Sequence, residues 1–311
     1  MRAYSIFDDF THEAREILNC AGVELTVHPI GVSRPDHDQM KMILEEYDCV
    51  IIGTSQKITE DMFEHIDNPR IIATASVGLD HISVPEEKKS LITIINTPKA
   101  NALSVAEYTM GCALSCVKRL VEGNHLYKAG KSNKELNQKP EDLFGKTIGV
   151  IGAGNISTRI MEYAQFFGMK VLCWTRNPAN HKDLKKKNVL FVTLEELVVA
   201  SDVISVNLPN NAETKGIISS RLIDMMKPTA IFISVSRLET IDVMALIQKA
   251  NYRFSFYVCL DIDVDETVAK IMQDQANIII TPHIAGGTVE TRRRMFGEVA
   301  AQIANLVERT E

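Results

Sequence analysis

An arginine and a histidine in the second half of the chain could together reduce a carbonyl group that lies beside a carboxylate. Arg237 follows the apolar run 230–235, and a guanidinium can bind a carboxylate through two parallel hydrogen bonds and polarise the neighbouring carbonyl. His283 follows the apolar run 278–281, and an imidazole can give a proton to the nascent alkoxide or take it back in the reverse direction. A surface salt bridge for Arg237 and a structural role for His283 remain the alternatives.

Two further segments contain groups that this chemistry would need. The stretch 260–266 carries Asp261 and Glu266 among its acidic residues, and one of its carboxylates could hold the second ring nitrogen of His283 and fix its tautomer. The stretch 75–80 is typical of a glycine turn after a strand, whose backbone N–H groups could bind a substrate carboxylate. Taken alone, the first stretch could equally be a solvated loop and the second an ordinary turn.

A glycine-rich turn near the middle of the chain predicts a dinucleotide site. An apolar strand over 147–151 leads into Gly152-x-Gly154, and an amphipathic helix over 156–167 follows. This order lets backbone N–H groups approach a pyrophosphate at the positive end of a helix. Ser157 stands where a third glycine is common, so the glycine string is a weak signal that depends on the strands around it.

Alternating strands and helices predict the fold class α/β, with two doubly wound parallel-sheet domains. Residues 99–283 are expected to form a Rossmann dinucleotide-binding domain that opens with a long helix over 104–121. Residues 1–98 plus 284–311 are expected to form a flavodoxin-like substrate domain. Strands are predicted at 3–7, 24–28, 49–53, 71–74, 93–96, 147–151, 170–174, 203–208, 230–235, 257–260 and 278–281.

The bulk composition excludes several classes of function. A net charge of −6 leaves no global field that would recruit nucleic acid or an anionic membrane. No apolar stretch reaches the roughly 18–20 residues that span a bilayer. The first residues lack the apolar run of a signal peptide, so a cytoplasmic protein is expected. Cys112 and Cys116 could share a helix face, but no second Cys/His pair has ligand spacing, and no metal site is predicted.

With these segments in this order, the chain resembles the D-2-hydroxyacid dehydrogenase family over nearly its whole length. The resemblance implies a catalytic set of Arg237, Glu266 and His283, which match the family segments N-x-A-R-G-x-x-V-D, L-D-V-F-x-x-E-P and T-P-H-I-(A/G)-G. It implies that Val77 and Gly78 bind the carboxylate of a small 2-keto acid or 2-hydroxy acid substrate through their backbone. It also implies a homodimer joined through the cofactor domains.

The resemblance further implies a set of cofactor-binding residues. The nicotinamide would meet Asp261 through its amide group and lie near Thr109 on the first helix of the cofactor domain. The other implied contacts fall at the phosphates, at the adenosine end and in a loop on the cofactor side. They are Gly152, Gly154, Asn155, Ile156, Thr175, Arg176, Asn207, Pro209 and Thr214.

Several residues depart from the family pattern, although none removes a proton carrier or the carboxylate clamp. Leu238 replaces the glycine after the arginine and adds bulk close to it, which could alter substrate choice or rate. The other departures are Lys99, Ser157, Asn210, Asn211 and Thr267.

The end of the second strand of the dinucleotide unit bears on cofactor choice. NAD-selective sites place an acidic residue there to accept a hydrogen bond from the ribose 2′-OH, whereas this chain has Thr175 followed by Arg176. NADP is therefore favoured. NAD stays open, because Arg176 could simply stack on the adenine.

The first-domain loop 53–59 bears on substrate choice. Phosphoglycerate enzymes of the family typically carry arginines there, whereas this loop has only Lys57 as a cation. The resemblance therefore favours glyoxylate, hydroxypyruvate or a small apolar 2-keto acid, with reduction as the physiological direction. One alternative is a nucleotide-sensing, corepressor-like protein of the same fold. Another is a methyltransferase with a similar glycine turn, which would not explain the catalytic set.

Overall fold

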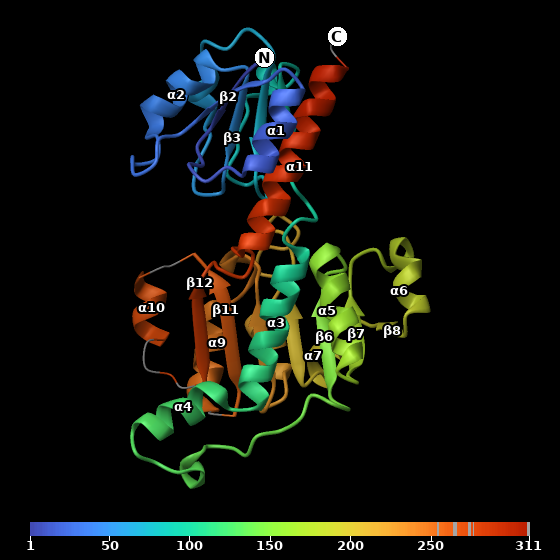
Figure 1. Cartoon of the computed structure of the whole chain (residues 1–311). Helices are drawn as coiled ribbons and strands as arrows, with labels where there is room; N and C mark the ends of the chain where they lie inside the picture. Colours follow the sequence, from blue (N-terminus) through green and yellow to red (C-terminus); the bar gives the residue numbers. More distant parts are fainter. Residues whose placement is uncertain (254, 264–265, 273–274, 276, 310–311) are drawn as a thin grey trace. The chain divides into compact units, whose positions relative to one another are not determined.

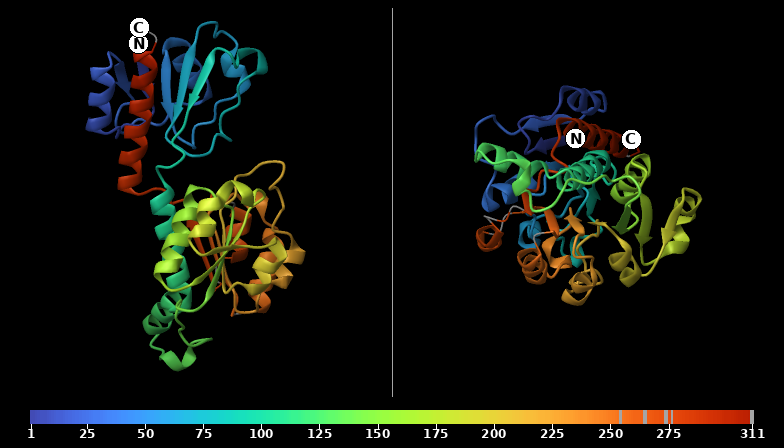
Figure 2. Two further views of the ribbon diagram at one scale, coloured as in Figure 1. Left: turned by 90° about the vertical axis from the view of Figure 1, so that its right-hand side faces the viewer. Right: turned by 90° about the horizontal axis from the view of Figure 1, so that it is seen from below.

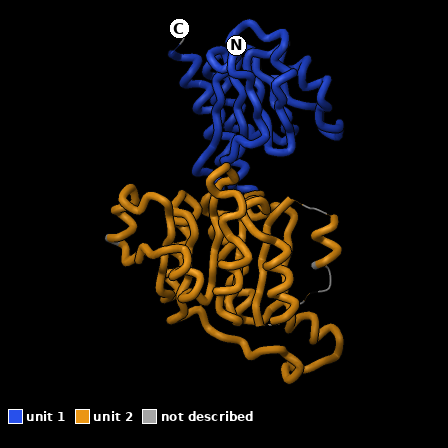
Figure 3. The backbone as a smooth tube through the Cα atoms, turned by 180° about the vertical axis from the view of Figure 1, so that it is seen from behind, with its two compact units in different colours: residues 1–101, 288–311 blue, residues 102–287 orange. Residues whose placement is uncertain are grey.

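The chain folds into two compact units, each built around its own parallel sheet (Figure 3). Unit 1 contains residues 1–101 and 288–311, and unit 2 contains residues 102–287. The boundaries expected from the sequence were 98/99 and 283/284, and the assignment of substrate and cofactor to separate domains stays a prediction. The structure is a computed structural model that describes residues 1–253, 255–263, 266–272, 275 and 277–309.

Unit 1 has a five-stranded sheet in the order β2-β1-β3-β4-β5, and all its strand pairs are parallel (Figure 1). β3 is buried at every position, which is the pattern of a central parallel strand covered on both faces. The elements of this unit are β1 (Arg2–Ser5), α1 (His12–Cys20), β2 (Glu24–Val27), α2 (His37–Glu46), β3 (Cys49–Ile52), η1 (Glu60–Phe63), β4 (Arg70–Thr74), η2 (Glu86–Lys88), β5 (Ile92–Ile95) and α11 (Val289–Glu308).

The last helix of the chain completes the core of unit 1. α11 packs beside α1, as the views of Figure 1 and Figure 2 show. Phe296 of α11 is 1% exposed, and its ring centre lies 5.0 Å from that of Phe7 and 4.7 Å from that of Phe10. Because buried aromatic rings remove much apolar area from water and attract one another, the two ends of the sequence share one core.

Unit 2 has a seven-stranded sheet in the order β12-β11-β10-β9-β6-β7-β8, again parallel throughout. The strand order reverses beside β6, so the loops after β6 and β9 meet at a switch point of the doubly wound fold. The predicted fold class is confirmed, although β8 was not among the predicted strands. The strands are β6 (Thr147–Ile151), β7 (Lys170–Trp174), β8 (Val189–Phe191), β9 (Val203–Val206), β10 (Ile231–Ser234), β11 (Tyr257–Ile262) and β12 (Ile278–Pro282).

Helices cover both faces of this second sheet (Figure 1). α3 (Ala102–Val117) and α5 (Asn155–Phe166) share a core cluster on one face, and α7 (Leu194–Ala200), α8 (Ser220–Met225) and α9 (Val243–Tyr252) share another on the opposite face. The remaining helical segments are α4 (Leu120–Lys128), η3 (Asn133–Glu135), η4 (Pro178–His181), α6 (Lys182–Lys186), η5 (Leu238–Thr240) and α10 (Glu266–Met272). Within the described part of the chain, no helix has the length and apolarity to cross a membrane.

The single helix predicted over 104–121 is wrong, because the chain breaks between α3 and α4 at Arg119. This residue has a left-handed φ of 55° and is only 5% exposed. Its guanidinium lies 4.4 Å from the ring centre of Tyr257 and donates to the carbonyl of Cys116 at 3.1 Å and to Gln138 at 2.5 Å. These buried contacts offset a backbone conformation that costs about 1–2 kcal/mol.

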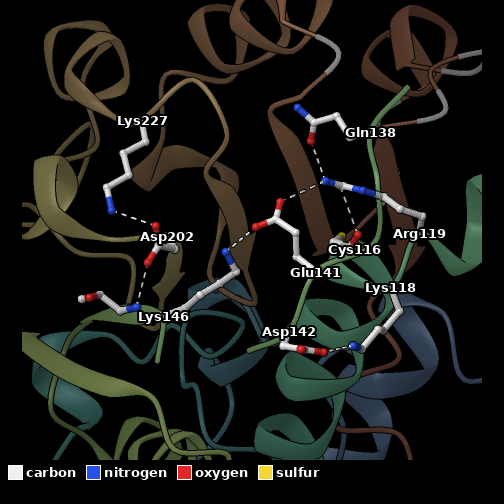
Figure 4. A network of polar contacts seen from close by, with 10 residues as sticks. Cys116, Lys118, Arg119, Gln138, Glu141, Asp142, Lys146, Asp202 and Lys227 are labelled. Atoms are coloured by element: carbon white, nitrogen blue, oxygen red, sulfur yellow. Dashed lines mark hydrogen bonds and ion pairs between the residues drawn. The ribbon is translucent and has the colours of Figure 1, made fainter. Parts of the chain in front are cut away.

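The polar segment that follows α4 is tied to the amino-terminal edge of the sheet by ion pairs (Figure 4). Glu141 binds the Nζ atom of Lys146 at 2.5 Å and lies 3.7 Å from the guanidinium of Arg119. Asp142 pairs with Lys118. This polar segment is therefore anchored at the edge opposite to the glycine turn.

Asp202, which directly precedes β9, binds two groups at the same edge of the sheet (Figure 4). Its carboxylate accepts the backbone N–H of Thr147 and the Nζ atom of Lys227, each at 2.8 Å. Burial alone would raise the pKa of Asp202, but these two bonds outweigh burial and hold that pKa below its ordinary value.

Candidate active site

The turn after β6 has a backbone geometry that glycine adopts easily and other residues do not. Gly152 has a φ of 103°, and a Cβ atom there would lie 2.7 Å from the carbonyl oxygen of Asn207. That backbone is fixed, because the N–H of Asn207 donates to the carbonyl of Ile151 at 3.0 Å. Gly152 therefore allows two segments to meet at the switch point where α/β folds bind their ligands.

The start of α5 offers backbone donors to an anion. Gly154 caps the helix without a side-chain hydrogen bond, and a Cβ atom there would meet no atom within 4 Å. The first N–H groups of a helix have no partner inside the helix and carry the positive end of its dipole, and Asn155 and Ile156 begin α5. An open turn with such donors fits a pyrophosphate.

Ser157, which replaces the third glycine, is accommodated inside the helix–sheet packing. Its side chain is fully buried, and its Oγ atom has no hydrogen-bond partner among the described residues. An unsatisfied buried hydroxyl costs about 1–3 kcal/mol. Ser157 therefore places an uncompensated hydroxyl in this packing and leaves the glycine turn intact.

Arg176, which comes shortly after β7, is engaged by a carboxylate. Its guanidinium pairs with Glu213 in the segment between β9 and α8, and both side chains are largely exposed. Thr175, which precedes it, is half-buried. The positive charge that was predicted to meet a 2′-phosphate therefore has a competing partner within the protein.

The loop after β9 is held together by its own side chains. The Oδ1 atom of Asn211 accepts the N–H groups of Glu213 and Thr214 at 3.0 and 3.1 Å. Thr214 is 1% exposed and donates its hydroxyl to the carbonyl of Pro209 at 2.5 Å. Asn211, a departure from the family pattern, thus forms a turn that asparagine favours.

On α3, Tyr108 contacts the edge strand β12, whereas the place of its neighbour Thr109 near a nicotinamide stays a prediction. Thr109 is fully buried and donates its hydroxyl to the carbonyl of Val105 within the same helix at 2.9 Å. The hydroxyl of Tyr108 lies 2.6 Å from that of Thr281 in β12. Tyr108 was not singled out from the sequence, because a half-buried tyrosine in an apolar helix carries no motif.

Arg237 follows β10 and is half-buried at the carboxyl end of this strand. Its carbonyl accepts the hydroxyl of Thr240 at 2.8 Å, which fixes the short turn η5. Leu238 packs against the core cluster on the α7–α9 face of the sheet. The bulk that this leucine adds to the family pattern is therefore taken up by the core.

His283 follows β12 and has a left-handed backbone, with a φ of 51°. Its Nδ1 atom lies 3.0 Å from Oδ1 of Asp263. Among the described residues, Asp263 is the carboxylate that contacts the ring, whereas Glu266, which the resemblance implied, begins α10. The contact occupies Nδ1, so Nε2 is the ring nitrogen that stays available to a ligand.

Asp261 fixes the loop that carries His283. Its Oδ1 atom accepts the hydroxyl of Thr281 at 2.6 Å and the N–H of Ile284 at 2.8 Å, and its Oδ2 atom accepts the N–H of Ala285 at 2.8 Å. A left-handed residue other than glycine persists when its surroundings over-determine it, and these bonds do so. The contact of Asp261 with a nicotinamide amide stays a prediction.

In unit 1, the turn after β4 presents two backbone donors. Among the described residues, neither the N–H of Val77 nor that of Gly78 donates to a protein atom. Their carbonyls are used, since that of Val77 accepts from Asn96 and that of Gly78 accepts from Ser76, each at 2.8 Å. The turn is thus fixed while its donors stay available to a carboxylate.

A cation that the local sequence did not reveal lies beside the loop after β3. Arg34, from the segment between β2 and α2, donates to the Oγ atom of Ser55. Gln56 is buried and donates to the carbonyl of Pro35 at 3.1 Å, which ties the two segments together. This approach could not be predicted from local sequence, because the two segments are separate in the chain.

These residues occupy the same edge of their respective sheets. Parallel strands end together, so the glycine turn after β6, Arg237 after β10, Asp261 in β11 and His283 after β12 follow the carboxyl edge of the sheet of unit 2. The turn at 77–78 follows the carboxyl edge of the sheet of unit 1. Among the described residues, no group of His, Cys, Asp and Glu side chains could hold a metal ion.

Comparison with known families identifies the larger unit. Residues 110–285 match the model of the D-isomer specific 2-hydroxyacid dehydrogenase, NAD binding domain. The chain belongs to this D-2-hydroxyacid dehydrogenase family. Unit 2 is therefore the NAD(P)-binding domain of a D-2-hydroxyacid dehydrogenase, and the family expected from the sequence is confirmed.

Relatives of this D-2-hydroxyacid dehydrogenase include proteins with different substrates and cofactors. A hydroxypyruvate reductase from Thermotoga maritima is 34% identical over 303 residues. The alignment covers 95% of this chain and 95% of that protein. An acyclic imino acid reductase in complex with NADPH and D-Arg superposes with a TM-score of 0.87 at 25% identity, covering 99% of this chain and 98% of that one. D-lactate dehydrogenase from Aquifex aeolicus, complexed with NAD and lactic acid, superposes with a TM-score of 0.81 at 27% identity. The superposition covers 99% of this chain and 96% of that one.

Proposed function

We propose that the protein reduces glyoxylate, hydroxypyruvate or a similar small 2-keto acid to a D-2-hydroxy acid, with NADPH preferred over NADH. The observation that carries this proposal is the position of Arg237 after β10 and of His283 after β12, on either side of β11 at one sheet edge. Family membership and the similarity to a hydroxypyruvate reductase support the reaction class.

The proposed roles follow from the chemistry of each group. Arg237 holds the substrate carboxylate and polarises the adjacent carbonyl, and Val77 and Gly78 of unit 1 are the proposed backbone donors to a substrate carboxylate. His283 donates a proton from Nε2 to the carbonyl oxygen and takes it back in the oxidative direction. Asp263 accepts a hydrogen bond from Nδ1 and so favours the ring orientation in which Nε2 faces the substrate.

The proposed cofactor site uses the open turn and the adenosine end described above. NAD(P)H, when bound, supplies the hydride. Its phosphates would be held by the backbone of the turn from Gly152 to Ile156, and Arg176 would bind the 2′-phosphate of NADPH after leaving Glu213. Asn207 lines the switch point beside Gly152. The hydroxyls of Thr109 and Thr214 donate within the protein, so either would meet the cofactor as a hydrogen-bond acceptor.

The proposed reaction is tested by the consumption of NADPH with a panel of 2-keto acids. We expect the highest kcat/KM with glyoxylate or hydroxypyruvate, and a loss of about 10²- to 10⁴-fold for His283→Ala, since general acid–base catalysis contributes about that much. Cofactor binding, followed by nicotinamide fluorescence, should persist in this variant. His65→Ala, which removes an exposed histidine of unit 1, is the control and should leave turnover unchanged.

Other outcomes of the same panel would contradict the proposal. Full activity of His283→Ala would show that His283 is not the proton donor. Phosphohydroxypyruvate as the best substrate would overturn the substrate assignment, and Arg34 beside the loop after β3 would be the first residue to suspect. Cofactor binding without turnover of any keto acid would indicate a corepressor-like interaction protein.

Two matched variants decide which carboxylate serves His283. Asp263→Asn should lower kcat by about tenfold, because it removes the charge that contacts Nδ1. Glu266→Gln should have a smaller effect, since Glu266 does not contact the ring. The opposite ranking would restore the assignment that the resemblance implies.

A further inference from the structure

A chain of polar groups connects α3 to the loop that carries His283. The hydroxyl of Tyr108 lies 2.6 Å from that of Thr281, and Thr281 donates to Oδ1 of Asp261 at 2.6 Å. Asp261 and Thr281 face each other as register partners in β11 and β12. Asp261 is 3% exposed, so the chain of hydrogen bonds ends on a buried carboxylate.

The direction of these hydrogen bonds is set by the number of hydrogens available. Thr281 has a single hydroxyl hydrogen, and it donates this hydrogen to Asp261. The hydroxyl of Tyr108 must therefore donate to Thr281. Burial raises the pKa of Tyr108, which favours the protonated hydroxyl that this direction requires.

The far end of the chain of bonds holds the two residues that follow His283. Asp261 accepts the N–H groups of Ile284 and Ala285, each at 2.8 Å. The left-handed backbone of His283 costs about 1–2 kcal/mol and needs such restraint. Any shift of Asp261 therefore relaxes the backbone that aims the imidazole.

We propose that Tyr108 and Thr281 are positioning residues, whose hydroxyls act in series through Asp261 to hold His283 in its left-handed conformation. The catalytic meaning of this proposal rests on the proposed function, in which His283 transfers the proton. Neither hydroxyl needs to touch substrate or cofactor. Series action means that removing either hydroxyl releases the same restraint.

Single variants give the first test. Tyr108→Phe and Thr281→Val should each lower kcat by about 10- to 100-fold, because a displacement of about 1 Å can cost roughly that much. The KM for the cofactor should stay within about twofold, since the glycine turn is untouched. Thr281→Ser keeps the hydroxyl and should retain most of kcat. A rise in KM with unchanged kcat would overturn the proposal.

The double variant gives the decisive test. If the two hydroxyls act in series, Tyr108→Phe combined with Thr281→Val should lose no more kcat than Thr281→Val alone. Losses that multiply would show two independent roles and overturn the proposal. Tyr257→Phe is the matched control, because this buried tyrosine begins β11 and donates to Glu122 at 3.2 Å at the other end of the strand. This control should leave kcat unchanged.

Hydrogen exchange tests the restraint without using activity. The amides of Ile284 and Ala285 should exchange faster in Tyr108→Phe and Thr281→Val than in the unaltered protein, and Tyr257→Phe should not change them. Faster exchange in a protein that reduces no keto acid would support the role of the two hydroxyls in holding this backbone. It would contradict only the proposed catalytic function of His283. Unchanged exchange would overturn the proposal even if the enzyme is active.

Discussion

Arg176 has two possible anionic partners, and the balance between them bears on cofactor choice. Its guanidinium pairs with Glu213, and the exposed fractions of the two side chains are 45% and 68%. Exposed ion pairs are weak and easily exchanged. A 2′-phosphate could therefore replace the carboxylate, but Glu213 would repel that phosphate at the same time.

Neutralising this carboxylate should strengthen the proposed preference for NADPH. Glu213→Gln is expected to raise the ratio of kcat/KM for NADPH to that for NADH by about two- to fivefold, because it frees Arg176 and removes a like charge. Steady-state kinetics with both cofactors measures the ratio.

The control for this prediction is another exposed carboxylate of unit 2. Glu195→Gln breaks the pair with Arg221, whose atoms lie 2.9 Å apart, and should leave the ratio unchanged. An equal gain for NADH in Glu213→Gln would show that Arg176 does not meet the 2′-position.

At the scale of elements, the amino-terminal edge of the larger sheet depends on one carboxylate. Asp202 holds the first N–H of β6 and the Nζ atom of Lys227 (Figure 4). Because its pKa is lower in the folded protein, its contribution to stability is present above the pKa of the unfolded chain, about 3.9, and is lost as the pH falls through the folded pKa.

Removing this charge should destabilise the protein in a pH-dependent way. Asp202→Asn is expected to lower the free energy of unfolding by about 1–3 kcal/mol at pH 7, and the difference should shrink below about pH 4. Urea unfolding at several pH values measures it. Asp142→Asn breaks the pair with Lys118 at an exposed site and should cost much less. An equal cost for both variants would contradict this account.

The same elements show what local sequence can and cannot specify. Gly152 was predictable, because the strand, the turn and the helix around it are contiguous in the chain. The break at Arg119 was not, because it depends on Tyr257 and Gln138, which approach only in the folded unit. The contact of Asp263 with His283 was equally hidden, since several acids of one short segment compete for the ring.

At the scale of the whole molecule, α4 exposes apolar side chains that a partner subunit could cover. The exposed fractions of Leu120 and Tyr127 are 58% and 84%. We propose that two copies of the chain associate through unit 2. α4 is then a candidate contact, in place of the longer single helix expected from the sequence. Sedimentation of the unaltered protein should give twice the mass of one chain.

A charged side chain in this contact should shift the protein toward monomers. Tyr127→Glu is expected to do so, because it buries an unpaired charge between subunits. Tyr252→Glu alters a tyrosine of α9 that is equally exposed, at 85%, and should leave the dimer intact. A monomer as the native state would contradict the proposed assembly.

The residue types expected at the candidate site could be predicted from the sequence, whereas several of the contacts that hold them could not. Arg237 and His283 stand at strand ends that the periodicity of the sequence locates. Arg34 and Tyr108 were missed, because each acts on a segment distant in the chain and neither belongs to a motif. Residues that do chemistry carry local patterns, whereas residues that hold them in place are recognised by their contacts.

The chain passes from unit 1 to unit 2 just before α3 and returns just after Gly287. Tyr108 stands one turn and a half into the outgoing helix, and Asp261 grips the residues that lead to the return. The two segments that connect the units are thus held by the same series of hydrogen bonds within unit 2. We therefore expect that a tether, crosslink or graft in unit 1 that pulls on either connecting segment changes the orientation of the His283 ring.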